Sequence, residues 1–115
     1  MEVKASLKGY RISAQKARLV VDEVRNKGVE EALNILAVSQ KKFAGPLSKL
    51  LQSAIANAED QNDTHNAGLD VDRLKITHIS VDEGPSMWRI RARAQGRANW
   101  LQKRTSHIRV VLSER

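Results

Sequence analysis

The first residues of the chain alternate between polar and apolar side chains, which is the period of a strand with one buried face. This alternation predicts a strand over residues 2–9. Small and β-branched residues then recur at helical spacing, at Ala17, Val20, Val21 and Val24. Ser13 precedes them as a potential cap and Gly28 follows as a stop. The pattern therefore predicts a first amphipathic helix between these two residues.

Two more helical patterns follow. The shorter one has apolar residues at Val29, Ala32, Leu33 and Leu36, with Glu30 and Glu31 in its first turn, where acidic groups suit the helix dipole. The longer one holds an apolar stripe for four turns, at Phe43, Leu47, Leu50, Leu51, Ala54, Ile55 and Ala58. Ser39 is its predicted cap. Because proline lacks an amide hydrogen, the helix either kinks at Gly45 and Pro46 or begins its regular part at Pro46.

The second half of the chain predicts strands. Residues Asp60 to Gly68 are rich in Asn, Asp, Gly and Thr and predict a surface loop. A strand is favoured from Arg73 to Val81, although its apolar phase slips between Ile76 and Ile79, which a bulge or burial on both faces would explain. A last strand is predicted by the clean alternation of Ile108, Val110 and Leu112, and it can pair with the strand before it.

Residues 82–106 separate these last two strands and are too many for an ordinary turn. A hairpin with about twelve residues per arm, at roughly 3.3 Å per residue, would project roughly 40 Å from the body. Two-stranded ribbons are marginal in water, so we expect a partner to order this one. Alternation would place Arg89, Arg91 and Arg93 on one side, with Trp88, Ile90, Ala92 and Ala94 on the other.

The surplus charge lies in the same part of the chain. Between Gly84 and Ser113 there is no Asp or Glu, but there are seven basic residues: Arg89, Arg91, Arg93, Arg97, Lys103, Arg104 and Arg109. The whole chain has 20 Lys and Arg against 13 Asp and Glu, so this segment accounts for the net charge of +7. A polyanionic partner is predicted. A solvated charged face is the weaker alternative, because no acid balances the segment.

Two features leave alternatives open. A second set of basic residues lies in and around the first predicted helix: Arg11, Lys16, Arg18, Arg25 and Lys27. These residues either form an ordinary exposed helix face or contact RNA. Trp88 and Trp100 can stack on unpaired bases, at roughly 1 to 3 kcal/mol each, or pack across the ribbon.

Length and composition narrow the class of protein. A chain of 115 residues is predicted to form one domain. Because 41% of the residues are hydrophobic but only 3% are aromatic, the core is predicted to be aliphatic. Without cysteine there is no disulfide or thiolate metal site, which fits a reducing compartment. The first ten residues lack the apolar run of a signal peptide or a spanning helix, so we expect a cytoplasmic protein without a membrane partner.

Catalytic and metal-binding signals are weak. His65, His78 and His107 are far apart in sequence and lack the short spacings of common metal sites. Asp82 and Glu83 are adjacent and would point to opposite faces of a strand, so they make a poor acid/base pair. The chain also lacks the nucleophile-elbow, phosphate-loop and dinucleotide-binding motifs. We therefore expect no enzymatic activity and no cofactor.

Several segments resemble one family. They are RISAQKARLVVDEVR (11–25), EEALNIL (30–36), SAIANAE (53–59), VDEGPSM (81–87) and KRTSHI (103–108). In this order, over about residues 1–113, they are similar to bacterial large-subunit ribosomal protein L twenty-two. The resemblance implies an α+β fold, with a small three-stranded antiparallel sheet, three helices and a long protruding β-hairpin at 82–106. It also implies a structural component of the large ribosomal subunit that supports assembly.

The resemblance further implies that the body sits near the outer end of the nascent-peptide exit tunnel, while the hairpin threads between rRNA domains and lines the tunnel wall. Expected partners are large-subunit (23S) rRNA, neighbouring ribosomal proteins and the nascent polypeptide. A general RNA-binding chaperone outside the ribosome is the alternative, since a cationic arm alone gives sequence-independent affinity.

Two residue sets follow as site candidates. The expected rRNA-binding residues are Arg11, Lys16, Arg18, Arg25, Arg89, Arg91, Arg93, Arg97, Lys103, Arg104 and Arg109. The candidates for tunnel lining or base stacking are Met87, Trp88, Ile90, Ala92, Ala94, Gln95, Gly96 and Trp100.

The chain departs from the family pattern in the hairpin. Trp88, Gln95 and Trp100 stand where the family usually has Lys or Arg, and Ala92 replaces a common Pro. Each lost phosphate contact would lower the slope of log affinity against log salt concentration, which we call the salt slope, by about 0.7 to 0.9. We therefore expect RNA binding that is less salt-sensitive than that of a typical family member.

Overall fold

The computed structural model describes residues 2–65, 68, 71–92, 96 and 98–114. Strand β1 spans Glu2–Tyr10, and three helices follow: α1 (Ala14–Val24), α2 (Val29–Val38) and α3 (Ala44–His65). A short 3₁₀ turn, Val71–Arg73, leads into the remaining strands, which are β2 (Leu74–Glu83), β3 (Met87–Ala92), β4 (Ala98–Lys103) and β5 (Ser106–Glu114). These elements confirm the predicted α+β fold.

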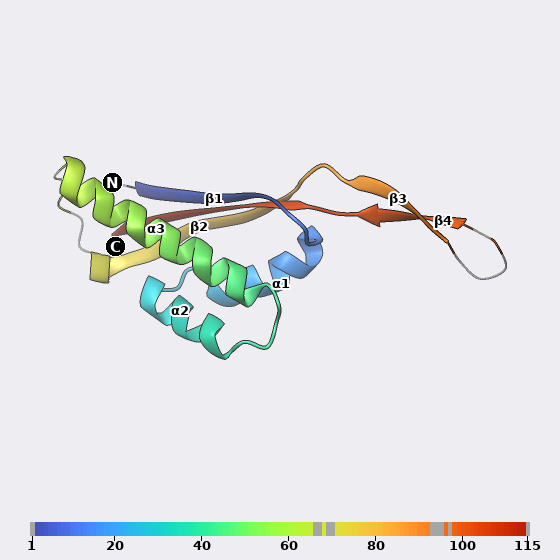
Figure 1. Cartoon of the computed structure of the whole chain (residues 1–115). Helices are drawn as coiled ribbons and strands as arrows, with labels where there is room; N and C mark the ends of the chain where they lie inside the picture. The colour runs from blue at the N-terminus through green and yellow to red at the C-terminus, as the bar shows by residue number, and fades with distance from the viewer. Residues whose placement is uncertain (1, 66–67, 69–70, 93–95, 97, 115) are drawn as a thin grey trace.

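The strands form two separate antiparallel sheets. A three-stranded sheet has the order β1-β5-β2, and β3 pairs with β4 in a two-stranded sheet. Helix α3 packs against β1 and α1 packs against β2, so the helices cover one face of the larger sheet (Figure 1). The smaller sheet extends away from this body as a hairpin, at the end opposite the two chain termini (Figure 1).

The core lies between the helices and the covered face of the larger sheet. Its fully buried side chains are aliphatic apart from Ser106, as the low aromatic content predicts, and include Leu47, Leu51, Ile76, Ile79, Ile108 and Leu112. Phe43 is also buried and meets the ring of Tyr10 at the edge of this cluster, with centroids 5.6 Å apart. Ser106 is buried without an unmet polar group, because its hydroxyl donates to the carbonyl of Ile12 at 2.7 Å.

The phase slip predicted in the strand from Arg73 to Val81, which is β2, is a β-bulge. The register of β2 against β5 shifts between Ile76 and His78. Since one extra residue reverses the alternation, Ile76 and Ile79 are both buried although they are three positions apart. Of the two explanations that the sequence left open, the bulge is the one confirmed.

The end of the first helix was placed wrongly. The helix ends at Val24, and Asn26 takes the left-handed backbone conformation, with φ of 62°. Gly28 is not its stop but the cap residue before α2, and its carbonyl accepts the amide of Ala32. The connection between the two helices is therefore longer than predicted, because it spans residues 25–28.

The predicted bounds of the third helix also need correction. Ser39 does not cap it, because this residue ends α2 and α3 begins at Ala44. The expected loop at 60–68 is helical as far as His65. Pro46 lies in the first turn, where the first intrahelical bond runs from the amide of Leu47 to the carbonyl of Phe43. A missing amide there costs no helical hydrogen bond, so no kink is needed.

The hairpin joins the body through a short neck, which we define as residues 84–86 and 104–105, between the ends of the two sheets. The amide of Gly84 donates to the carbonyl of Thr105 at 2.9 Å, and the Thr105 hydroxyl donates to the carbonyl of Pro85 at 2.7 Å. The molecule measures 64 × 28 × 17 Å, and its radius of gyration is 17.4 Å. A compact chain of this length would have a radius of about 13 Å, so the difference reflects the protruding hairpin.

Candidate nucleic-acid interface

The hairpin has two chemically different sides. Its register places Arg89 opposite Leu101 and Met87 opposite Lys103, whereas Trp88 faces Gln102 and Ile90 faces Trp100. Side chains alternate along each strand, so Arg89 and Lys103 share one side and the two tryptophans share the other. We call these the cationic side and the indole side. The predicted alternation is confirmed between Met87 and Ala92.

Part of the expected site lies outside the described residues. These positions are Arg93, Ala94, Gln95 and Arg97, which come between β3 and β4 in the sequence. Arg91 pairs with Asn99 in the backbone register, and Ala92 pairs with Ala98 at the last described step of the ladder. Gly96 has a φ of +73°, a conformation that glycine adopts readily and other residues rarely do.

The two tryptophan rings remain largely in solvent. Trp88 is 59% exposed and Trp100 is 67% exposed, with Ile90 at 64% between them. The one ring pair within the described part of the chain joins Tyr10 and Phe43, so the indoles do not stack on each other. Packing across the ribbon thus buries little of either ring, and both remain available to a partner.

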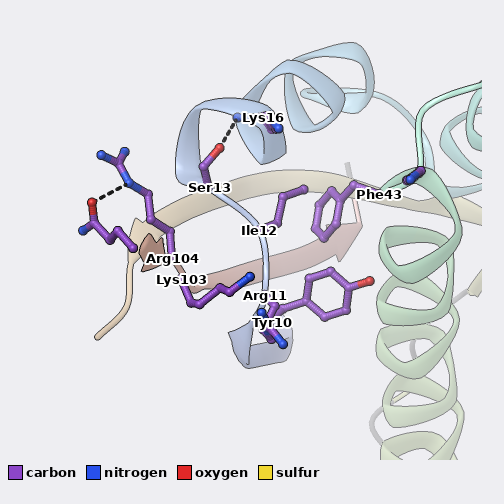
Figure 2. Close-up of a pocket in the computed structure, with 10 residues that line it drawn as sticks. Tyr10, Arg11, Ile12, Ser13, Lys16, Phe43, Lys103 and Arg104 are labelled. Atoms are coloured by element: carbon purple, nitrogen blue, oxygen red, sulfur yellow. Dashed lines mark hydrogen bonds between the residues drawn. The ribbon is translucent and has the colours of Figure 1, made fainter. Parts of the chain in front are cut away.

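A basic hollow lies where the hairpin meets the body. It has a volume of about 470 Å³ and is lined by Tyr10, Arg11, Ile12, Ser13, Lys16, Lys42, Phe43, Gln102, Lys103 and Arg104. We call it the junction hollow. Figure 2 shows Arg11, Lys103 and Arg104 around it, with the start of α1 close by. Five of the lining residues are cationic and the described lining contains no carboxylate, so the hollow suits an anion.

Local bonds hold parts of this hollow in place. The Ser13 hydroxyl accepts the amide of Lys16 at 3.4 Å and caps α1, as predicted. Arg104 donates from Nε to Oε1 of Gln102 at 3.4 Å, which leaves its terminal nitrogens free of described protein partners (Figure 2). Lys42 was not predicted from the sequence, because only the fold brings the connection before α3 beside Arg11 and Lys16. Its neighbour Lys41 would be an equally good candidate on charge alone.

Two predicted RNA-binding arginines have a role within the body. Arg18 donates from Nη2 to the carbonyl of Val81 at 2.9 Å, and Arg25 donates from Nη1 to the carbonyl of Ile79 at 2.8 Å. Both carbonyls lie on the outer edge of β2, the edge strand of the described sheet, where an isolated bridge joins Gly28 to Lys75 further along. The arginines therefore satisfy an open sheet edge. Arg25 also pairs with Asp22 at 3.3 Å. RNA contact stays a prediction for both residues.

Arg109 belongs to a different surface from the rest of the basic segment. It lies at the centre of β5 and is exposed on the face of the sheet that no helix covers. A shallow hollow of about 410 Å³ surrounds it, and its polar lining comes from Lys4, Ser6, Lys8, His78 and Arg109. The acid-free segment thus supplies charge to two surfaces, the hairpin and the open sheet face.

The described residues form no cluster of three or more His, Cys, Asp or Glu side chains that could hold a metal ion. His107 instead accepts the amide of Gly9 on Nδ1 at 2.9 Å, which ties the end of β1 to β5. In the described part of the chain, no helix combines the length and apolar character needed to span a membrane.

Comparison with protein families gives a match over nearly the whole chain. The family described as ribosomal protein L22p/L17e matches residues 5–113. This range includes the body, the neck and the hairpin, and the family consists of structural ribosomal proteins, not enzymes. It places the chain in the cytoplasm, within the large subunit. The chain therefore belongs to the L22p/L17e family of ribosomal proteins, which are rRNA-binding structural components of the large ribosomal subunit.

Proposed function

We propose that the hairpin of this ribosomal protein is an rRNA-inserted arm that helps to line the nascent-peptide exit tunnel. The observation that carries the proposal is a hairpin without Asp or Glu on β3 or β4, which stands outside the body as its own two-stranded sheet. Such a ribbon lacks a layer to bury its side chains. Walls of RNA around it would supply both the missing contacts and the counter-charge.

The basic residues would contact RNA at three places, according to their position in the fold. Arg89 and Lys103 on the cationic side would contact phosphates along the inserted arm, and Arg91, Arg93 and Arg97 would extend this contact toward the tip. The guanidinium group suits this role because its fixed donor fork matches paired phosphate oxygens. Arg11, Lys16, Lys42 and Arg104 would hold a phosphate at the base of the arm, where the junction hollow is. Arg109 would contact a separate RNA segment on the open sheet face.

The RNA role is tested by comparing the intact protein with a variant lacking Met87 to Lys103. Both are titrated against folded 23S rRNA and unrelated RNA of equal length over a salt series. We expect selective binding that weakens, with a smaller salt slope, when the hairpin is removed. Equal binding of the intact protein to both RNAs would instead favour a general RNA chaperone.

The tunnel role is tested by cross-linking. The chain has no cysteine, so Ala92→Cys introduces a single thiol on the hairpin. Ribosomes that carry this variant would be stalled with a nascent chain containing one cysteine, and treated with a short thiol-reactive cross-linker. Gln40→Cys, on the exposed α2–α3 connection, is the matched control. Cross-links from residue 92 alone would support the proposal, and equal labelling from both positions, or from neither, would contradict it.

A further inference from the structure

We propose that the indole side of the hairpin is a binding site for unpaired RNA bases, which stack on the rings of Trp88 and Trp100. The inference rests on the proposed RNA-inserted arm and adds the chemical group that this side of the arm recognises. It also assigns a different chemical group of RNA to each side of the hairpin. The cationic side takes phosphates, and the indole side takes the faces of nucleobases.

The first argument is the concentration of exposed apolar surface. The described residues have six large hydrophobic side chains that are strongly exposed, namely Leu19, Val38, Met87, Trp88, Ile90 and Trp100. Three of them lie together on the indole side, whereas Leu19 and Val38 lie singly on different helices. Scattered exposed apolar residues are normal in soluble proteins, but a contiguous group of them marks an interaction site.

The second argument is the spacing of the rings. Trp88 faces Gln102 across the ladder and Trp100 faces Ile90, so the two tryptophans are diagonal neighbours. Diagonal side chains on one side of an antiparallel pair start about 7 to 8 Å apart. Stacked bases are about 3.4 Å apart, so this separation is close to that of two rings with one base between them. Because the indoles do not stack on each other and both are largely exposed, their faces are accessible to such a base.

The third argument is the charge around the patch, which favours RNA over a polypeptide. Arg89, Lys103 and Arg104 flank the ribbon, and neither β3 nor β4 carries a carboxylate. A single RNA strand can place its phosphates against these cations while its bases turn toward the indoles. A paired duplex hides its base faces and would satisfy the cations only. The expected ligand is therefore single-stranded or bulged RNA, with purines preferred because they offer the larger stacking surface.

The experiment uses the fluorescence of the intact protein. Trp88 and Trp100 are the two tryptophans of the chain, so its tryptophan emission reports on the indole side alone. The protein is titrated with a short oligoadenylate, an oligouridylate of the same length and an RNA duplex with the same number of phosphates. Anisotropy of labelled RNA measures binding independently. We expect saturable quenching by oligoadenylate, weaker quenching by oligouridylate, and little quenching by the duplex even when anisotropy shows it bound.

Variants separate stacking from charge. Trp88→Leu and Trp100→Leu keep an apolar side chain but remove the flat ring, and each should weaken oligoadenylate binding by about 5- to 100-fold while changing duplex binding little. Trp100→Phe, which keeps a ring, should retain most of the affinity. Leu19→Ala, which trims an exposed apolar residue on α1, is the matched control and should bind as the wild type does. Circular dichroism confirms that each variant is folded.

The possible failures are distinguishable. Full oligoadenylate affinity in both Leu variants, or binding without any change in emission, would overturn base stacking. The proposed function would still stand in that case if removal of the hairpin weakened selective binding to 23S rRNA. Quenching by unstructured polypeptides but not by RNA would overturn the inference too, because it would assign the indole side to a protein ligand.

Discussion

At the scale of single residues, the neck depends on the absence of one side chain. A Cβ atom at Gly84 would lie 2.6 Å from Oγ1 of Thr105, well inside normal contact distance. That hydroxyl cannot move freely, because it donates to the carbonyl of Pro85. The sequence shows the glycine next to a proline but does not show which atoms crowd it. The close approach arises only when the two ends of the hairpin meet.

We expect Gly84→Ala to lower the free energy of unfolding by about 1 to 3 kcal/mol, because the new methyl group displaces Thr105. Thermal unfolding followed by circular dichroism measures the change. In a Thr105→Ala background the same substitution should cost less, since the crowding atom is gone. Gly45→Ala is the control, because nothing lies within 4 Å of its Cβ position. An equal loss in both backgrounds would show that crowding by Thr105 is not the cause.

Residue charges were easier to predict than residue roles. Arg11, Lys16, Lys103 and Arg104 were predicted as anion-binding residues, and the fold brings all four to the junction hollow. The sequence could not show that they meet, because the hollow combines segments from the start, the middle and the end of the chain. Arg18 and Lys16 look alike in sequence, yet the bond to Val81 gives Arg18 a part in the body that Lys16 lacks.

At the scale of elements, periodicity predicted the strands well and the helix ends poorly. The alternation of β1 and β5 follows directly from one buried face, and the bulge in β2 was visible as a shift of phase. Helix ends depend on single capping residues, of which Ser13 was predicted correctly for α1 and two others were assigned to the wrong elements. Gly28 and Ser39 flank α2, whereas the sequence alone linked them to α1 and α3.

The open edge of β2 gives a prediction for α1. Arg18→Met should lower the free energy of unfolding by about 0.5 to 1.5 kcal/mol, because the carbonyl of Val81 loses a charged donor at the sheet edge. Lys16→Met, on the same helix, should leave stability unchanged and weaken RNA binding instead. Chemical denaturation and RNA titration of both variants measure the two effects. Equal stability of the two variants would mean that the bond to β2 contributes nothing measurable.

At the scale of the whole molecule, a compact body and a thin arm carry different tasks. The helices and the larger sheet enclose the core, whereas the described side chains of β3 and β4 are mostly exposed. The length, charge and alternating sides of the arm could be predicted from the sequence. The position of the neck could not be predicted, because it depends on where strand pairing in the larger sheet ends and pairing of β3 with β4 begins.

This division of tasks predicts that removal of positive charge from the arm leaves the stability of the body unchanged. The triple substitution of Arg89, Arg91 and Arg93 by Ala should leave the midpoint of thermal unfolding nearly unchanged. It should also lower the slope of log affinity against log salt concentration by about 2 to 3, the contribution of three phosphate contacts. Calorimetry and RNA titration measure the two quantities. A large drop in the midpoint would mean that these residues support the core.

The order of the strands has a consequence for synthesis of the protein. The central strand β5 follows the hairpin in the chain, and β1 and β2 each pair with β5 but not with each other. Until β5 has left the ribosome that makes it, β1 and β2 therefore have no neighbour and the larger sheet cannot form. The hairpin emerges earlier than β5. A newly made chain therefore exposes the hairpin while the larger sheet is still incomplete, and this sheet closes only when β5 is added.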